Sequence, residues 1–122
     1  MKVISTPNAP AAIGPYSQGY EAGGFVYTSG QIGVNPADGV APEGIEAQAH
    51  QSCKNVGAVL AAAGVDFSKV FKTTCFLADM GDFAAVNAVY EQYFTSKPAR
   101  SCVAVKTLPK GLLCEIEAIA EK

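Results

Sequence analysis

Among the charged side chains of this sequence, one arginine is the first candidate for chemistry. Arg100 is the only arginine in a chain with eight lysines, and it opens a run, 100–108, that has the character of a strand. Arginine grips a carboxylate through two parallel hydrogen bonds, whereas lysine offers only a point charge. The position favours a carboxylate ligand, with a structural ion pair to Glu115 or Glu117 as the alternative.

The last apolar segment, 114–120, carries two glutamates at alternating positions. In a strand, Glu115 and Glu117 point to one face and Ile116 to the other, because side chains alternate. Carboxylates on a surface that faces another subunit are costly without partners. We therefore expect each to be paired, bound to water or functional, unless this face is simply solvated.

The chain geometry limits how the arginine and the first glutamate could cooperate. If the last two strands formed a simple hairpin about Lys110, Glu115 would lie opposite Val105, and Arg100 would be roughly 17 Å away at ~3.3 Å per residue. The two could not then share one small ligand within a chain. Cooperation requires another strand order or a site built between chains.

A stiffened loop near the N-terminus presents an aromatic side chain. In the stretch 9–19, Pro10 and Pro15 restrict the backbone and Gly14 permits an unusual backbone angle. Tyr16 follows at the start of a predicted strand. The loop can hold this phenol against a ligand, or it can be a plain connection with Tyr16 half-buried.

The stretch 28–31 offers a second set of polar groups. It places Ser29 beside Gly30 at the end of a predicted strand, where backbone amides can receive an anion or a carbonyl. The alternative is structural, because a glycine within a strand often marks a bulge.

Periodicity and turn residues place these candidates on an α+β framework. A helix is predicted over 43–63. A second helix is predicted to begin after Asp79 or Asp82 and to be closed by Pro98, with an apolar face made of Phe83, Val86, Tyr90, Tyr93 and Phe94. Strands are predicted at 2–5, 17–22, 25–32, 70–77, 100–108 and 114–120, with turns at 23–24 and 109–111. Too few helices are predicted to cover both faces of a sheet, so we expect them on one side and a partner on the other.

Composition narrows the class of protein. A chain of 122 residues suits one domain, 1–122. A net charge of −2 and scattered lysines give no basic stripe for nucleic acid. No apolar run approaches the ~20 residues of a membrane span, and no signal-peptide core is present, so a cytoplasmic protein is expected. A charged fraction of 16% is below the ~25% of an average domain, which favours a homo-oligomer.

The four cysteines and the single histidine do not indicate a metal site. Cys53, Cys75, Cys102 and Cys114 lack metal-ligand spacing and fall in apolar segments, so they are expected as buried, reduced thiols. His50 lies between two charged residues at helical spacing and is expected on a solvated face.

Five stretches, taken together, resemble the RidA family, also called the YjgF family. They are "APAAIGPYSQG", "YTSGQI", "DFAAVNAVY", "KPARSCV" and "EIEAIA", and their order and spacing span essentially the whole chain. The resemblance implies a fold like that of Bacillus chorismate mutase, with a mixed sheet backed by two helices. It also implies a homotrimer whose ligand sites lie in clefts between subunits.

The same resemblance implies hydrolysis of 2-imino acids, such as 2-iminobutanoate and 2-iminopropanoate, to 2-oxo acids and ammonia, without a metal or cofactor. Arg100 matches the family's carboxylate-binding arginine, Glu115 its water-positioning glutamate and Tyr16 the tyrosine that lines the site. The remaining matches are expected to bind substrate: Ser29, Gly30, Asn87, and Cys102 through its backbone N–H. A short connection before Arg100 departs from several relatives and affects the rim of the cleft.

Three alternatives remain at the level of sequence. The same pocket could bind a 2-oxo acid or similar carboxylate in a non-enzymatic, regulatory protein, for which Glu115 would bring no advantage. An RNA-directed activity is disfavoured by the net charge and by the lack of a histidine pair. Chorismate mutase activity is disfavoured because its substrate carries two negative charges and the chain offers a single arginine to bind them.

Overall fold

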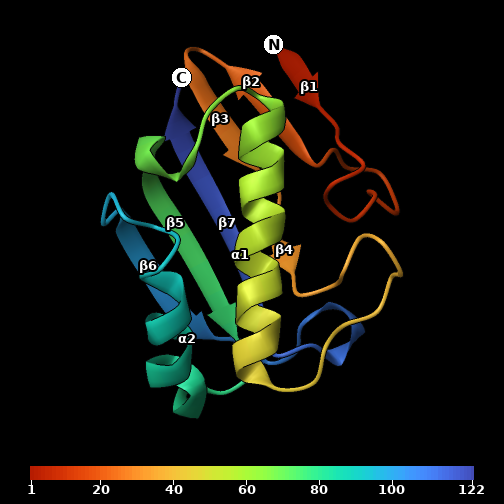
Figure 1. Ribbon diagram of the computed structural model, residues 1–122, viewed down its shortest axis with the longest axis vertical. Helices are drawn as coiled ribbons and strands as arrows, with labels where there is room; N and C mark the ends of the chain where they lie inside the picture. Colours follow the sequence, from red (N-terminus) through yellow and green to blue (C-terminus); the bar gives the residue numbers. More distant parts are fainter.

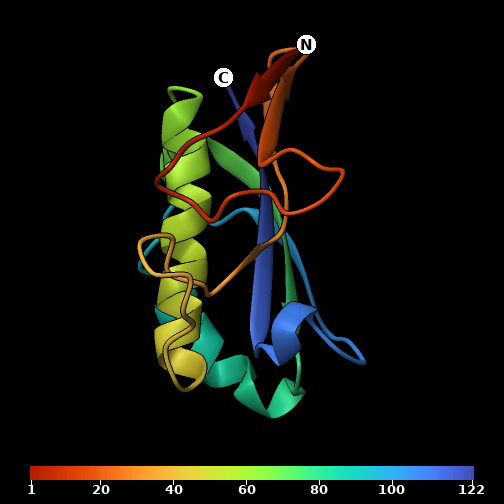
Figure 2. The same ribbon diagram turned by 90° about the vertical axis from the view of Figure 1, so that its right-hand side faces the viewer.

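A mixed seven-stranded sheet carries both α-helices on one of its faces (Figures 1 and 2). The computed structural model describes residues 1–122. The strand order is β1-β2-β3-β7-β5-β6, with β4 also paired to β7. The strands are β1 Lys2–Ile4, β2 Gly19–Ala22, β3 Phe25–Thr28, β4 Gln31–Ile32, β5 Val70–Leu77, β6 Ala99–Ala104 and β7 Cys114–Glu121. All pairings are antiparallel except that of β5 with β6.

The long helix α1, Ile45–Ala62, is the element that periodicity predicts best. Its buried positions recur every three or four residues, as an amphipathic helix on a sheet requires; they include Ala49, Cys53, Val56 and Leu60. The helix ends where Gly64 adopts a φ of 79°, a left-handed conformation that glycine accepts readily. The predicted range of 43–63 is therefore confirmed to within two residues.

The second helix, α2, is shorter than its apolar pattern predicts. It spans Phe83–Tyr90 and is preceded by a 3-10 turn that Asp79 caps by accepting a hydrogen bond from the Gly81 N–H at 2.8 Å. Phe94 is buried beyond the end of the helix and stacks on Tyr90 with ring centroids 4.3 Å apart. The apolar pattern therefore extends past the end of the helix, because Phe94 is buried although it is not helical.

The hairpin predicted at Gly23 and Gly24 is present. Both glycines have positive φ, 61° and 85°, as a tight two-residue hairpin turn requires, and Ala22 pairs with Phe25 across it. The last two strands, by contrast, do not pair with each other, because β5 lies between β6 and β7. A simple hairpin about Lys110 is therefore excluded.

No α-helix covers the other face of the sheet (Figure 2). Large apolar side chains are exposed on the strands, and they are Val3, Tyr20, Phe25, Tyr27, Phe71 and Val103. The expectation that the helices lie on one side is confirmed. Neither α-helix is long and apolar enough to cross a membrane.

Three of the four cysteines are buried as free thiols, as expected, and Cys102 is half-buried. Burial raises the pKa of Cys75 to about 12 and that of Cys114 to about 11, so both thiols stay protonated at neutral pH. The expectation for His50 is wrong. Its ring is half-buried, and its Nδ1 lies 2.8 Å from the Tyr93 hydroxyl, which ties α1 to the segment after α2.

Candidate functional site

A β-bulge at Ser29 and Gly30 interrupts the strand predicted over 25–32. On one side of it Tyr27 pairs with Ile119 of β7, and on the other side Gln31 pairs with Ile116. Three residues of one strand therefore face two of the other, which bends the strand and re-aims its side chains. The Ser29 N–H donates to the carbonyl of Gln18 at 2.9 Å, and its hydroxyl donates to the carbonyl of Ser17.

The missing side chain of Gly30 makes room for the carboxylate of Glu115. A Cβ atom at Gly30 would lie 2.1 Å from Glu115 Oε2, so the flexible end of the Glu115 side chain would have to move away. Glu115 is half-buried here, and this burial, reinforced by the neighbouring charge of Glu117, raises the pKa of its carboxyl above the ordinary value of 4.5. The carboxylate is thus a stronger base than a freely solvated glutamate.

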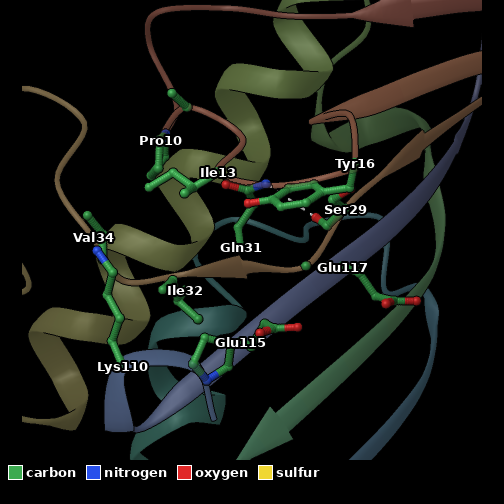
Figure 3. A pocket seen from close by; sticks show the side chains of 13 residues that line it. Pro10, Ile13, Tyr16, Ser29, Gln31, Ile32, Val34, Lys110, Glu115 and Glu117 are labelled. Atoms are coloured by element: carbon green, nitrogen blue, oxygen red, sulfur yellow. Dashed lines mark hydrogen bonds between the residues drawn. The ribbon is translucent and has the colours of Figure 1, made fainter. Parts of the chain in front are cut away.

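Glu115 lies in a cavity of about 720 Å³ on the bulged side of the sheet (Figure 3). Tyr16, from the loop before β2, lines the same cavity together with Ser29 and Gly30. Its walls are otherwise largely apolar, from Pro10, Ala11, Ile13, Ile32, Val34 and Pro109, with Gln31, Lys110 and Glu117 as further polar residues. Four of the predicted site residues, Tyr16, Ser29, Gly30 and Glu115, are therefore brought together; we call them the glutamate half-site.

Arg100 lies elsewhere, on the edge strand β6 next to α2. Its Nη1 donates to Asn87 Oδ1 at 2.8 Å, and its guanidinium carbon lies 4.8 Å from the ring centroid of Tyr90 and 5.5 Å from that of Phe83. A separate hollow of about 530 Å³ borders Asn87, Tyr90 and Arg100. We call Phe83, Asn87, Tyr90 and Arg100 the arginine half-site.

The Arg100 guanidinium is not paired with a carboxylate of its own chain. The ion pair in the structure joins Lys122 to Glu21 at 2.9 Å. The alternative of an ion pair with Glu115 or Glu117 is therefore wrong. Asn87 holds one edge of the guanidinium, and the rings of Tyr90 and Phe83 pack against it from the helix side, so its orientation is fixed.

The two half-sites lie on opposite faces of the sheet. Arg100 pairs with Thr73 of β5, whose buried side chain bonds the Tyr90 hydroxyl on the helix side. Glu115 pairs with Phe76, three residues further along β5, which faces the other way because side chains alternate. Their Cα atoms are about 14 Å apart at ~3.4 Å per residue and ~4.8 Å per strand. Within one chain they cannot hold the same small ligand.

Cys102, the remaining predicted site residue, lies two residues beyond Arg100 on β6 and beside Cys75 of β5. It lines neither hollow. Phe83 and Tyr90 were not predicted as site residues. Their spacing of four and three residues from Asn87 places them on one helix face, and this pattern could have identified them.

Lys110 was also missed, and it lies along the cavity edge in Figure 3. Its φ of 59° is unusual for a residue with a side chain. The sequence "PKG" was interpreted only as a turn, and nothing in its composition distinguishes a turn that borders a cavity from one that does not.

Comparison with known proteins agrees with this fold. A model of the family described as Endoribonuclease L-PSP matches residues 6–122. The chain is 54% identical to the 2-iminobutanoate/2-iminopropanoate deaminase of Escherichia coli K12, over 98% of this chain and 96% of that protein. It is 53% identical to the mouse protein of the same name, over 98% and 90% of the two chains. The crystal structure of E. coli TdcF with bound serine superimposes with a TM-score of 0.96 at 47% identity, covering 100% and 99% of the chains.

The fold and the match define a member of the Endoribonuclease L-PSP class of α+β proteins. The chain belongs to the RidA family, also called the YjgF family, whose E. coli YjgF structure it matches with a TM-score of 0.96 at 52% identity.

Proposed function

We propose that this protein is a deaminase that hydrolyses reactive 2-imino acids to 2-oxo acids and ammonia. The names of its E. coli and mouse relatives support 2-iminobutanoate and 2-iminopropanoate as substrates. The observation that carries the proposal is an oriented Arg100 fork without a carboxylate partner, combined with a half-buried Glu115 of raised pKa. We assign residues 1–122 to one domain that performs this reaction.

Two copies of the chain are needed to complete one site. The half-sites face away from each other within a chain, so an arginine half-site from one copy would meet the glutamate half-site of the next. A closed ring of copies, a homotrimer, satisfies this head-to-tail requirement at every boundary. The exposed apolar side chains of the open sheet face would be buried in the same assembly.

Substrate recognition is assigned to the carboxylate of the imino acid. Arg100 binds it through two N–H groups, and Asn87 keeps the guanidinium in place. We assign further substrate contacts to Ser29 and Gly30 at the bulge and to the backbone N–H of Cys102. Tyr16 closes the cavity above the reacting carbon.

Water addition is assigned to Glu115. Its carboxylate accepts a proton from a water molecule as the oxygen attacks the imine carbon, and it later returns that proton to the nitrogen. The substrate enters as the protonated imine, so the nitrogen now carries three hydrogens. The C–N bond breaks and ammonia leaves, while the new hydroxyl group gives its proton to Glu115 as the C=O bond of the 2-oxo acid forms. A raised pKa favours this role because a general base works best when its pKa is close to the working pH.

The alternative of a non-enzymatic carboxylate receptor shares Arg100 with this proposal. The E. coli TdcF structure contains bound serine, an amino acid that either a receptor or an enzyme of this kind could accommodate. Glu115 distinguishes the two functions. A receptor gains nothing from it, because a second negative charge beside a bound carboxylate weakens binding, whereas a deaminase uses it as a base. Cleavage of RNA, which the name of the matching family suggests, is not proposed because the cavity carries two carboxylates and the single histidine bonds Tyr93.

A trapping assay tests the proposed reaction. A threonine dehydratase releases 2-iminobutanoate, which semicarbazide captures in competition with hydrolysis. Addition of the protein should reduce the amount of trapped imine in proportion to its concentration. Unchanged trapping at saturating protein would remove the deaminase proposal and leave the receptor alternative.

Mixing two inactive variants tests the assembly. A trimer that contains both Arg100→Ala and Glu115→Gln chains has one intact cleft, at the boundary where a wild-type glutamate half-site meets a wild-type arginine half-site. Random mixing should therefore restore about a quarter of wild-type activity. As a control, Arg100→Ala chains mixed with the double variant should restore none. Absence of recovery in verified mixed trimers would contradict a site shared between chains.

A substitution at the bulge tests the placement of Glu115. In Gly30→Ala the new methyl group would displace the Glu115 carboxylate, so the trapping activity should fall by about 10²-fold or more, within the range of general base catalysis. Gly81→Ala is the matched control, since its new methyl group would lie near the exposed Asp79 side chain, away from the cavity. Wild-type activity in Gly30→Ala would show that Glu115 need not occupy this position.

A further inference from the structure

Gln18 is a buried polar residue that neither half-site includes. It immediately precedes β2, is 4% exposed, and directs its carboxamide into the loop that connects β1 to β2. A buried amide is retained only where its hydrogen bonds offset the cost of removing it from water. Its partners therefore indicate what it holds in place.

All partners of the Gln18 side chain are backbone groups of one short segment, 6–10. The Thr6 N–H donates to Gln18 Oε1 at 2.7 Å. Gln18 Nε2 donates to the carbonyls of Pro10 at 2.8 Å, Thr6 at 3.0 Å and Ala9 at 3.2 Å. The carboxamide thus binds both ends of the segment and folds it around itself.

Little else holds this loop by hydrogen bonds. No hydrogen bond between two backbone groups involves residues 7–13, and the Asn8 N–H bonds only the nearby Thr6 hydroxyl, at 3.1 Å. Two prolines in the segment lack the N–H group that such bonds need. Apart from the packing of the buried Ala9 in the core, the loop is therefore held mainly by the hydrogen bonds of one side chain.

The same loop forms a wall of the cavity. Pro10 and Ile13 line it, and Tyr16 follows two residues before Gln18. The Gln18 carbonyl accepts the Ser29 N–H at 2.9 Å, so the backbone of Gln18 is also fixed to the bulge. Figure 3 shows Tyr16 close to Ser29 in the same wall.

From these contacts we infer that Gln18 is the positioning residue of the glutamate half-site: its carboxamide holds the loop 6–16 in the shape that presents Tyr16 and Pro10 to the ligand. It acts through the loop and does not touch the reacting atoms. The inference rests on the proposed function for the identity of the ligand. It concerns ligand binding, since Glu115 lies on a different strand.

Two variants separate the hydrogen bonds of Gln18 from its volume. Gln18→Leu keeps a side chain of similar size without polar atoms, and Gln18→Glu keeps the acceptor for the Thr6 N–H but loses the donor for three carbonyls. Val56→Ala is the control for a general loss of stability, because Val56 is a fully buried residue of α1, outside the loop and the cavity.

The first readout is the affinity for 2-oxobutanoate, measured by calorimetry at a temperature at which each variant is folded. Both Gln18 variants should bind about tenfold more weakly, as expected for the loss of buried hydrogen bonds that order a binding loop, while turnover at saturating imine falls much less. Val56→Ala should bind as the wild type does. Unchanged affinity in folded Gln18→Leu would overturn the inference.

The second readout is hydrogen exchange in the wild-type protein, which does not depend on a variant that folds. The Thr6 amide should exchange more slowly when 2-oxobutanoate is bound, because the ligand favours the loop shape that Gln18 maintains. If 2-oxobutanoate binds and the Thr6 amide does not respond, the inference is wrong. If the wild type neither binds 2-oxobutanoate nor hydrolyses imine, the proposed function fails, and faster exchange of residues 6–13 in Gln18→Leu than in Val56→Ala still decides whether Gln18 orders the loop.

Discussion

Arg100→Ala is expected to remove the effect of the protein on imine trapping, with kcat/KM lower by about 10²- to 10³-fold, as for the loss of one member of a desolvated charge pair. The side chain supplies the guanidinium of the arginine half-site, and among the lysines only Lys97 borders the same hollow. Activity is measured by semicarbazide trapping, and affinity by titration with 2-oxobutanoate.

Arg100→Lys distinguishes charge from geometry at the same position. It keeps the positive charge but loses the planar fork, the bond geometry to Asn87 and part of the stacking on Tyr90. We expect activity between those of the wild type and Arg100→Ala, and closer to the latter. The melting temperature and the oligomer size of both variants serve as controls, because Arg100 makes a single side-chain hydrogen bond and no ion pair within the chain. Full activity in Arg100→Lys would show that a point charge is sufficient.

Periodicity and residue type in the sequence correctly predicted the long helix and the central strand. The helix α1 and the strand β5 occur where periodicity and β-branched residues place them. The second helix was predicted too long because Tyr93 and Phe94 continue the apolar face of α2. Both rings pack against Phe67, which lies far away in the sequence, and Phe94 also stacks on Tyr90. Side-chain pattern alone therefore does not show where this helix ends.

The position of the site depends on contacts that are not local. Residues 25–32 have the pattern of one strand, but the bulge at Ser29 and Gly30 is set by the register of β7 and by bonds to Ser17 and Gln18. The sequence identified Arg100 and Glu115 from their chemistry. Their separation to opposite faces follows from the register of β6 and β7 on β5, because Arg100 pairs with Thr73 and Glu115 with Phe76, an odd number of residues further along, and this register is a property of the whole sheet.

The contacts around Glu115 suggest that the site is built at the expense of stability. The half-buried carboxylate has a raised pKa, so its ionised form is less favourable in the folded state than in the unfolded chain. Gly30 admits this carboxylate and cannot be replaced by a residue with a side chain without displacing it. A catalytic base of this kind is expected to improve activity and to reduce stability at neutral pH.

Glu115→Gln should therefore change activity and stability in opposite directions. Glutamine keeps the shape of the side chain but cannot accept the proton of water, so kcat should fall by about 10²- to 10⁴-fold, the usual contribution of a general base. Binding of 2-oxobutanoate should persist or strengthen, because a negative charge has been removed from the cavity. Retention of wild-type turnover would instead show that Glu115 is not the general base of the reaction.

The effect on stability has a defined dependence on pH. Because the pKa of Glu115 is higher in the folded state, the folded wild type binds an extra proton between the ordinary value of 4.5 and the raised value, and its stability falls as pH rises through this range. Glu115→Gln lacks this loss, so in a chain whose Glu115 faces no neighbouring guanidinium it should raise the denaturant concentration needed for unfolding at pH 7, and the gain should vanish below pH 4.5. In an Arg100→Ala background, where no guanidinium from a neighbouring chain would face the carboxylate, the gain at pH 7 should be larger. An equal gain in both backgrounds would show that the two half-sites do not meet, and this would contradict the shared cleft independently of any activity measurement.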